Sequence, residues 1–349
     1  MKQQALRTIA TLSFLLMLTA ATAYAQSGHV RAVSREAAAG NILCGAPNAT
    51  LLATGLEGAT GSTVGPGGAL YVTEGAAGRI SRVDPQTGEI TTFASGLPKS
   101  IIGIGGAIDV AFIGQTAYVL VTLVGSQFGG SDVVGIYRVD GPNSFTVVAD
   151  IGEFNLHNPP TIPFPFFIPT GLQFALETYR GGFLVTDGHL NRVLRVTLDG
   201  EVAVLIAFDD IVPTGLAVSG NTVYMAEAGP VPHLPQNGKV VSFGPKSPTA
   251  TGVASGASLL VDVEFGRGRI LYALSQGDFL VGSDPGTPAL PNTGALVKVN
   301  GDGTFTVITD GLDRPTSLEF IQDTAYVVTL TGEIWRIDGV SCPPYGVSF

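Results

Sequence analysis

The chain has 349 residues, of which 28 are acidic and 18 are basic, so its formal net charge is −10. This acidic balance argues against nucleic acid or an anionic membrane surface as the partner. Only 13% of the residues are charged and 47 are glycine. Such a composition favours strands and tight turns, so an all-β fold is expected.

Residues 1–25 have the pattern of a secretory signal peptide. Lys2 and Arg7 precede the apolar run Ile9 to Ala20, and Ala23-Tyr24-Ala25 forms an A-x-A cleavage site. We therefore expect a mature chain that starts at Gln26 and is exported to the periplasm or the extracellular space. A membrane span is not expected in it, because no later stretch approaches roughly 18 continuous apolar residues. Retention of the apolar run as an N-terminal anchor is the alternative.

A pattern of strand, loop, strand and Gly/Asp turn recurs six times along the chain. The first copy runs through Leu70–Glu74, 79–84 and Glu89–Leu97. A unit of strands that repeats at roughly 40 to 50 residues is typical of a β-propeller, here with six blades. The expected second strands are 70–74, 117–121, 183–187, 223–227, 271–275 and 325–329. The expected inner strands are 62–64, 108–112, 170–174, 214–218, 261–265 and 316–320.

The mature chain reads as one domain, residues 26–349, because no linker or change of composition divides it. The expected blades are 60–97, 106–151, 169–208, 213–254, 258–310 and 315–338. The last blade has no fourth strand of its own, and residues 50–56 resemble 92–97. We therefore expect the N-terminal strand to pair onto the last blade and close the ring, which removes two open sheet edges.

The two cysteines fall on either side of this closure. Cys342 follows the last third strand and Cys44 precedes the closing strand. In an exported protein with an even number of cysteines we expect a Cys44–Cys342 disulfide, with two free thiols as the alternative. Closing a loop of about 300 residues would contribute about 4 to 5 kcal/mol in the chain-entropy model.

The loops of a propeller open on two faces. We call first face the side that carries the loops between second and third strands and the connections between blades, and second face the opposite side. The long loops 122–132, 152–169, 228–238 and 276–294 all fall on the first face, together with His157, His189 and His233. Long loops in a compact fold are usually functional or disordered, so a ligand site is expected on the first face.

Five acids mark this expected site. Glu74, Asp187 and Glu227 end second strands, whereas Asp109 and Asp262 lie in the inner strands of the opposite blades two and five. Such carboxylates near imidazoles could form an acid/base pair or hold Ca²⁺ or Mg²⁺, with Asp109, Asp262 and Glu74 as candidate metal ligands. In the alternative reading each acid caps a turn and each histidine is a solvated loop residue. No pair of histidines has a metal-binding spacing such as H-x-H.

Residues 158–169 contain five prolines and three phenylalanines. The prolines disfavour helix and inner strand, and the aromatic rings need a cover. The segment is predicted to be either a lid that gives a ligand an aromatic wall or a plug that fills the channel.

Three segments resemble NHL repeats: residues 65–74, 78–80 and 187–193. The mature chain as a whole is similar to the ScyD/ScyE family of exported bacterial propellers, which is named after genes associated with biosynthesis of the pigment scytonemin. The resemblance implies the fold and carries no catalytic residue across. Quinoprotein sugar dehydrogenases, streptogramin lyases and gluconolactonase-type propellers match less well, although Glu74 could play the first role in the Glu/Asn/Asp metal site of the last.

Two functions fit these observations. In the first, the protein binds or transforms a small molecule at the first face, with or without a divalent cation. In the second, the ring is a non-catalytic extracytoplasmic scaffold for a protein or a glycan. We expect a monomer in either case, and the catalytic residues stay unassigned.

Overall fold

The computed structural model describes residues 46–160, 168–244, 247–342 and 349. They belong to one compact unit. The predicted signal peptide, Cys44 and residues 161–167 of the proline-rich segment lie outside the described range. Within that range, no helix has the length and apolar character needed to cross a membrane.

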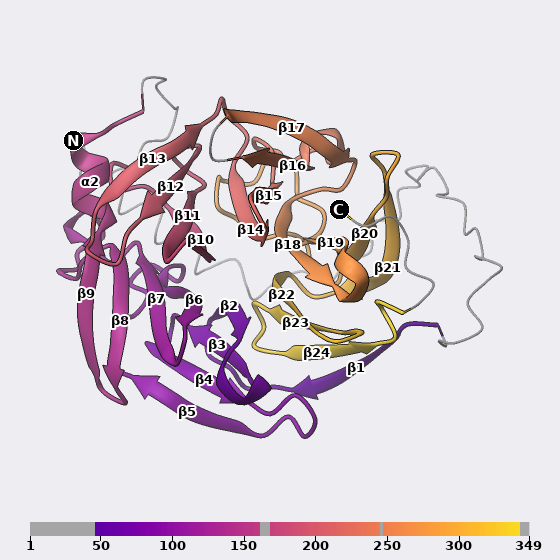
Figure 1. Ribbon diagram of the computed structural model, residues 1–349, viewed down its shortest axis with the longest axis horizontal. Coiled ribbons are helices and arrows are strands. Elements are labelled where there is room, and N and C mark those ends of the chain that lie inside the picture. The colour runs from indigo at the N-terminus through magenta and orange to yellow at the C-terminus, as the bar shows by residue number, and fades with distance from the viewer. Residues whose placement is uncertain (1–45, 161–167, 245–246, 343–348) are drawn as a thin grey trace. The chain divides into compact units, whose positions relative to one another are not determined.

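The described residues form six four-stranded antiparallel sheets arranged as a ring (Figure 1). Blades one to three consist of β2 Ala59–Val64, β3 Leu70–Glu74, β4 Arg79–Val83 and β5 Ile90–Ser95; β6 Gly106–Ile113, β7 Thr116–Thr122, β8 Gly135–Gly141 and β9 Ser144–Asp150; β10 Gln173–Tyr179, β11 Gly182–Asp187, β12 Arg192–Val196 and β13 Val202–Ala207. Blades four and five consist of β14 Pro213–Ser219, β15 Thr222–Glu227, β16 Lys239–Gly244 and β17 Ser247–Ser255; β18 Leu260–Gly266, β19 Ile270–Ser275, β20 Gly294–Val299 and β21 Phe305–Leu312. This confirms the predicted all-β, six-bladed propeller.

The sixth sheet contains strands from both ends of the described chain. It is formed by β22 Pro315–Ile321, β23 Thr324–Thr329, β24 Ile334–Asp338 and the outermost strand β1 Asn48–Ala53. β1 pairs antiparallel with β24, from Asn48 opposite Asp338 to Ala53 opposite Ile334. The chain therefore enters the ring on the blade in which it ends (Figure 1).

The core lies between neighbouring blades, because each strand alternates its side chains between the two faces of its sheet. In β3, Leu70 and Val72 pack in a buried cluster with Tyr326 and Val328 of blade six. Tyr71, between them in sequence, packs in the cluster shared with blade two. Each blade thus buries both of its faces, which explains why the second strands consist of continuous apolar runs.

Every inner strand is interrupted by a β-bulge at the same level. The register against the second strand shifts between residues 59 and 62, 107 and 109, 173 and 176, 213 and 216, 260 and 262, and 315 and 317. A bulge leaves backbone groups without a partner in the sheet ladder and turns the following side chains to a new direction. Six bulges at one level therefore re-aim six side chains next to the ring axis.

Side chains satisfy the backbone N–H groups around these bulges. Oδ2 of Asp109 accepts from Leu176 N of blade three at 2.7 Å, and Oδ2 of Asp262 accepts from Leu318 N of blade six at 2.7 Å. Thr73 and Thr186 accept from Gly61 N and Ala175 N within their own blades. The two aspartates therefore tie each of their inner strands to the next blade.

Two elements differ from the sequence prediction. The inner strand of blade three is β10, Gln173–Tyr179, and not residues 170–174, because its bulge brings Leu176 opposite Val185. A helix also follows blade two: α2, Ile151–His157, begins where the Asp150 side chain accepts from Glu153 N. Seven residues are too few for a helical period to show in the sequence.

Glycine is required beside both aspartates. A Cβ atom at Gly61 would lie 2.2 Å from Oδ1 of Asp109, and one at Gly215 would lie 2.3 Å from Oδ1 of Asp262. We expect Gly61→Ala and Gly215→Ala each to lower the free energy of unfolding by about 1 to 3 kcal/mol, as overpacking does. Urea denaturation measures this. Gly252→Ala is the matched control, since nothing lies within 4 Å of a Cβ atom there, and equal stabilities of all three variants would contradict the prediction.

Candidate functional site

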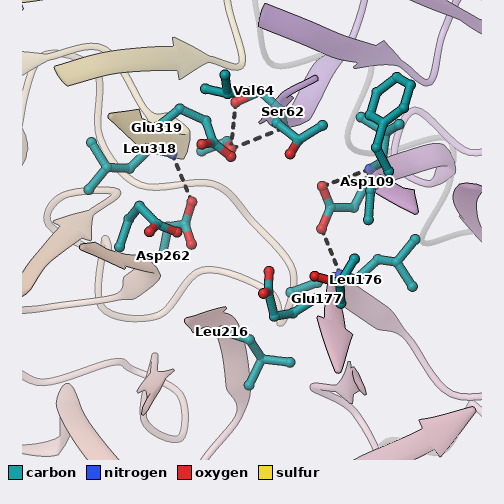
Figure 2. A pocket seen from close by; sticks show the side chains of 17 residues that line it. Ser62, Val64, Asp109, Leu176, Glu177, Leu216, Asp262, Leu318 and Glu319 are labelled. Carbon is teal, nitrogen blue, oxygen red and sulfur yellow. Dashed lines mark hydrogen bonds between the residues drawn. The ribbon is translucent and has the colours of Figure 1, made fainter. Parts of the chain in front are cut away.

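A cavity of about 240 Å³ lies in the channel between the inner strands (Figure 2). Five carboxyl groups line it, and none of the described lining residues is basic. The acids come from four of the six inner strands: Asp109 of β6, Glu177 of β10, Asp262 and Glu264 of β18, and Glu319 of β22. Acidic side chains are thus concentrated at the axis of the ring.

The cavity extends toward the second face. Inner strands run from the first face to the second, and the lining residues reach Val64, Phe112 and Thr178, at or next to the ends of their strands. On the side of the first face, Phe174 of blade three packs against the buried cluster of blades five and six, so its ring reaches across the channel. The sequence placed the site at the mouth on the first face, whereas these carboxyl groups lie beyond the level of Phe174.

The structure brings together two of the predicted site residues, Asp109 and Asp262. They lie on opposite sides of the cavity, as the ring order predicted (Figure 2). Each carboxylate accepts two backbone hydrogen bonds, one from the next blade and one from its own following residue, Val110 or Val263, at 2.8 Å. Both aspartates are therefore held in fixed orientations.

Three glutamates of the cavity were not predicted. Glu177, Glu264 and Glu319 occupy the same register position, one residue after Leu176, Val263 and Leu318. Two of them, Glu264 and Glu319, lie within predicted inner strands and could have been identified from the sequence. An ionisable residue in the middle of an apolar strand costs free energy to bury, which indicates a role. Glu177 was missed because the strand was placed four residues too early: Leu176 has the register position that the prediction gave to Leu172.

Burial raises the pKa of all five carboxyl groups. Protein surrounds them on every side, although the cavity leaves them some accessible surface, and loss of hydration disfavours the charged form. The pKa of Asp262 rises to about 7 and that of Glu264 to about 8. The pKa values of Asp109, Glu177 and Glu319 rise well above the ordinary range, first through burial and then through repulsion by the other carboxylates of the channel.

The other predicted acids lie outside the cavity and serve the blades that carry them. Glu74 is buried and accepts two hydrogen bonds from Arg79, at 2.8 Å each, together with bonds from Ser81 Oγ and Glu57 N. Asp187 is buried and accepts from the side chains of Asn155 and Gln173 and from two backbone N–H groups. The hydrogen bonds of Glu74 and Asp187 are therefore structural, and they hold loops of the first face in place.

Glu227 differs from these two acids. It is 4% exposed and lies opposite Lys239 in the register of β15 and β16. No ion pair joins the two side chains in the part of the chain that the structure describes. Burial raises the pKa of Glu227 to about 7. It sits at the first-face end of blade four, away from the cavity.

The three histidines occupy separate positions on the first face. Nε2 of His189 accepts from Ile168 N at 2.7 Å, which anchors the end of the proline-rich segment. Nδ1 of His233 donates to Gly229 O at 2.7 Å, and its ring contacts Phe279 edge to face. Burial lowers the pKa of both imidazoles. His157 ends α2, is exposed, and lies beside Glu153.

The predicted metal ligands are not assembled. Asp109 and Asp262 line the cavity, but Glu74 pairs with Arg79 in blade one. Among the described residues, no group of three or more His, Cys, Asp or Glu side chains is arranged to hold a metal ion.

Known structures share this fold at low sequence identity. A gluconolactonase from Xanthomonas campestris superimposes with a TM-score of 0.58 at 13% identity, over 84% of this chain and 89% of the other. A putative oxidoreductase (glucose dehydrogenase) from Thermus thermophilus gives 0.53 at 18%, over 83% and 99%. Virginiamycin B lyase from Staphylococcus aureus gives 0.50 at 12%, over 84% and 98%. No family model and no curated protein matches the sequence. These likenesses show the six-bladed propeller fold.

The raised carboxyl pKa values predict a loss of stability in alkaline solution. Between pH 6 and 9 the unfolded chain has its carboxyls ionised, whereas the folded channel still binds protons, so the free energy of unfolding falls as pH rises through about 7 for Asp262 and about 8 for Glu264. Thermal melts across this range should show a falling melting temperature.

Glu264→Gln should flatten that fall. Asp302→Asn is the control, since hydrogen bonds to Thr304 lower the pKa of Asp302, which therefore titrates below this range. A melting temperature that is constant or rises from pH 6 to 9 would show that the channel carboxyls ionise normally.

Proposed function

We propose that this chain is an exported six-bladed propeller protein that binds a small cationic molecule in the carboxyl-lined cavity. The observation that carries the proposal is the set of five carboxyl groups around one cavity, with no basic residue among the described lining. Each ionised carboxylate there raises the energy of the others, and the described lining supplies no cation to offset the repulsion. A cation of suitable size would relieve this repulsion and replace lost hydration.

The proteins of similar structure support a role for the ring in binding a small molecule. Two of the similar structures carry names of enzymes that act on small molecules, a gluconolactonase and virginiamycin B lyase. Their identity with this chain is too low to transfer a residue or a reaction. The proposal is therefore limited to binding of a ligand, and no reaction and no catalytic residue are assigned to the site.

The proposal also includes membership of the ScyD/ScyE family and export of the protein from the cytoplasm. The NHL-like repeats and the similarity to ScyD/ScyE propellers favour membership of that family. The A-x-A site at residues 23–25 supports export to the periplasm or the extracellular space. An exported protein meets ligands of the cell exterior, where small cations and amines are available in solution.

Ca²⁺ or Mg²⁺ is a less favoured occupant. Ca²⁺ needs six to eight oxygen ligands around one point. Asp109 and Asp262 lie on opposite sides of the cavity, and each already accepts two backbone hydrogen bonds. An organic cation needs fewer ligands in one place, so it suits this arrangement better.

A scaffold role has one observation in its favour. Loops of the first face expose large apolar side chains, among them Ile101 at 42%, Leu156 at 50%, Leu280 at 57% and Val281 at 72%. Exposed apolar side chains gathered on one face can mark a protein partner. That partner would meet the first face and leave the carboxyl cavity unused.

Ligand-induced stabilisation tests the binding proposal. A ligand that binds only the folded state stabilises it by about 2.7 kcal/mol at 100 times its Kd. We expect small amines to raise the melting temperature of the mature protein near pH 8, with a smaller shift or none from Ca²⁺ and Mg²⁺. The double variant Glu177→Gln/Glu319→Gln should reduce the amine shift, and Glu201→Gln, an exposed acid of the second face, should leave it unchanged. If no amine and no metal shifts the melting temperature, the cavity is not a cation site.

The predicted Cys44–Cys342 disulfide can be tested on the exported protein. Mass spectrometry should find both cysteines protected from alkylation until a reductant is added, after which two alkyl groups are gained. Removing the bridge should lower the free energy of unfolding by about 2 to 5 kcal/mol. Labelling of the unreduced, folded protein would show free thiols instead.

A further inference from the structure

The five channel carboxyls fall into two groups that face each other. Asp109 and Glu177 belong to blades two and three, whereas Asp262, Glu264 and Glu319 belong to blades five and six. In the ring of six, blade two is opposite blade five and blade three is opposite blade six. Figure 2 shows Asp109 and Glu177 on one side of the cavity, with Asp262 and Glu319 on the other.

Blades one and four separate the two groups and carry no acid at the cavity. Blade four lines it with Leu216, and blade one contributes Ser62, Thr63 and Val64. The hydroxyl groups of Ser62 and Ser317 bond to each other at 2.8 Å, so they are already satisfied. Between the two acidic groups the cavity is therefore lined by the aliphatic side chains of Val64 and Leu216 and by the hydroxyl side chains of Ser62 and Thr63.

The glutamates are freer to meet a ligand than the aspartates. Each aspartate accepts two backbone hydrogen bonds. Glu264 accepts one, from Phe265 N at 2.7 Å, and Glu177 interacts with the neighbouring Thr178. Glu319, surrounded by protein and facing the cavity, accepts no hydrogen bond that the described residues supply. An enclosed carboxyl group without a partner is costly, which points to a partner from outside the chain.

We propose that the cavity binds a linear aliphatic diamine, with one ammonium group between Glu264 and Glu319 and the other beside Glu177. This inference rests on the proposed function and specifies its ligand. Asp109 and Asp262 then act as positioning residues that hold the inner strands and add to the negative potential. The methylene chain of the diamine packs against Leu216 and Val64.

The size of the cavity agrees with this ligand. Its volume of about 240 Å³ lies below the ~300 to 1,000 Å³ of pockets for drug-sized molecules. A chain of roughly three to six carbons with an ammonium group at each end is the kind of small molecule that such a volume admits. A monoamine would leave one of the two acidic groups without a cation.

Calorimetric titration of the mature protein near pH 8 tests the inference. The probes are straight-chain α,ω-diamines of increasing length and the monoamine of matched carbon number. We expect an optimum length at which the diamine binds at least about tenfold more tightly than the monoamine, since it satisfies two acidic groups. Glu177→Gln and Glu319→Gln should each reduce the diamine affinity about tenfold and leave the monoamine affinity within a few-fold.

Controls separate this inference from the wider proposal. Glu201→Gln should bind the diamine as the parent does. The glutamine variants should be at least as stable as the parent, because each removes a buried acid, and urea denaturation verifies that they fold. Monoamine binding as tight as diamine binding, at every length, would overturn the diamine inference and leave the cation-binding function standing. Failure of every amine to bind would overturn both.

Discussion

The whole ring depends on which groups accept hydrogen bonds from the backbone N–H groups where the six inner strands converge on one axis. Each inner strand bulges at the same level, so its N–H groups need acceptors that the sheet does not provide. Threonine hydroxyls of the second strands supply some, and the carboxylates of Asp109 and Asp262 supply the bonds that cross to the next blade. Two acids are thereby fixed at the axis for structural reasons, and the neighbouring glycines make the space for them.

This constraint explains the electrostatics of the channel. Once two aspartates are buried at the axis, any further acid near them in the channel is repelled by their ionised forms and loses hydration. The chain nevertheless places Glu177, Glu264 and Glu319 there, two residues beyond the aspartate level. The bulges do not require these three side chains, since threonine hydroxyls and the two aspartates supply the acceptors there, although Glu264 also accepts from Phe265 N of its own strand. That is the physical reason for assigning function to the glutamates and structure to the aspartates.

The fold could be predicted from the sequence because each blade is formed by residues that are close together in the chain. Tyr71, Tyr118 and Tyr326 mark second strands whose spacing and turns define six repeats without any tertiary knowledge. The ring order then placed Asp109 opposite Asp262 correctly. The sequence analysis missed Glu177, because the alternation of residues along a strand does not reveal where a β-bulge occurs. The inner strand of blade three was therefore predicted at the wrong residues. The roles of Glu74 and Asp187 were equally hidden, since their partners Arg79 and Asn155 become neighbours only through strand pairing and the packing of α2.

The two faces of the ring differ in structure. On the first face, buried ion pairs and amide networks fix long loops whose apolar side chains remain exposed, as in Glu74 with Arg79 and Asp187 with Asn155. Phe174, at the first-face side of the carboxyl groups, packs against the buried cluster of blades three and four and against that of blades five and six. A small ligand of the cavity would then enter from the second face, where the turns are short. A partner protein on the first face would not obstruct that entry, so the two proposed roles are compatible.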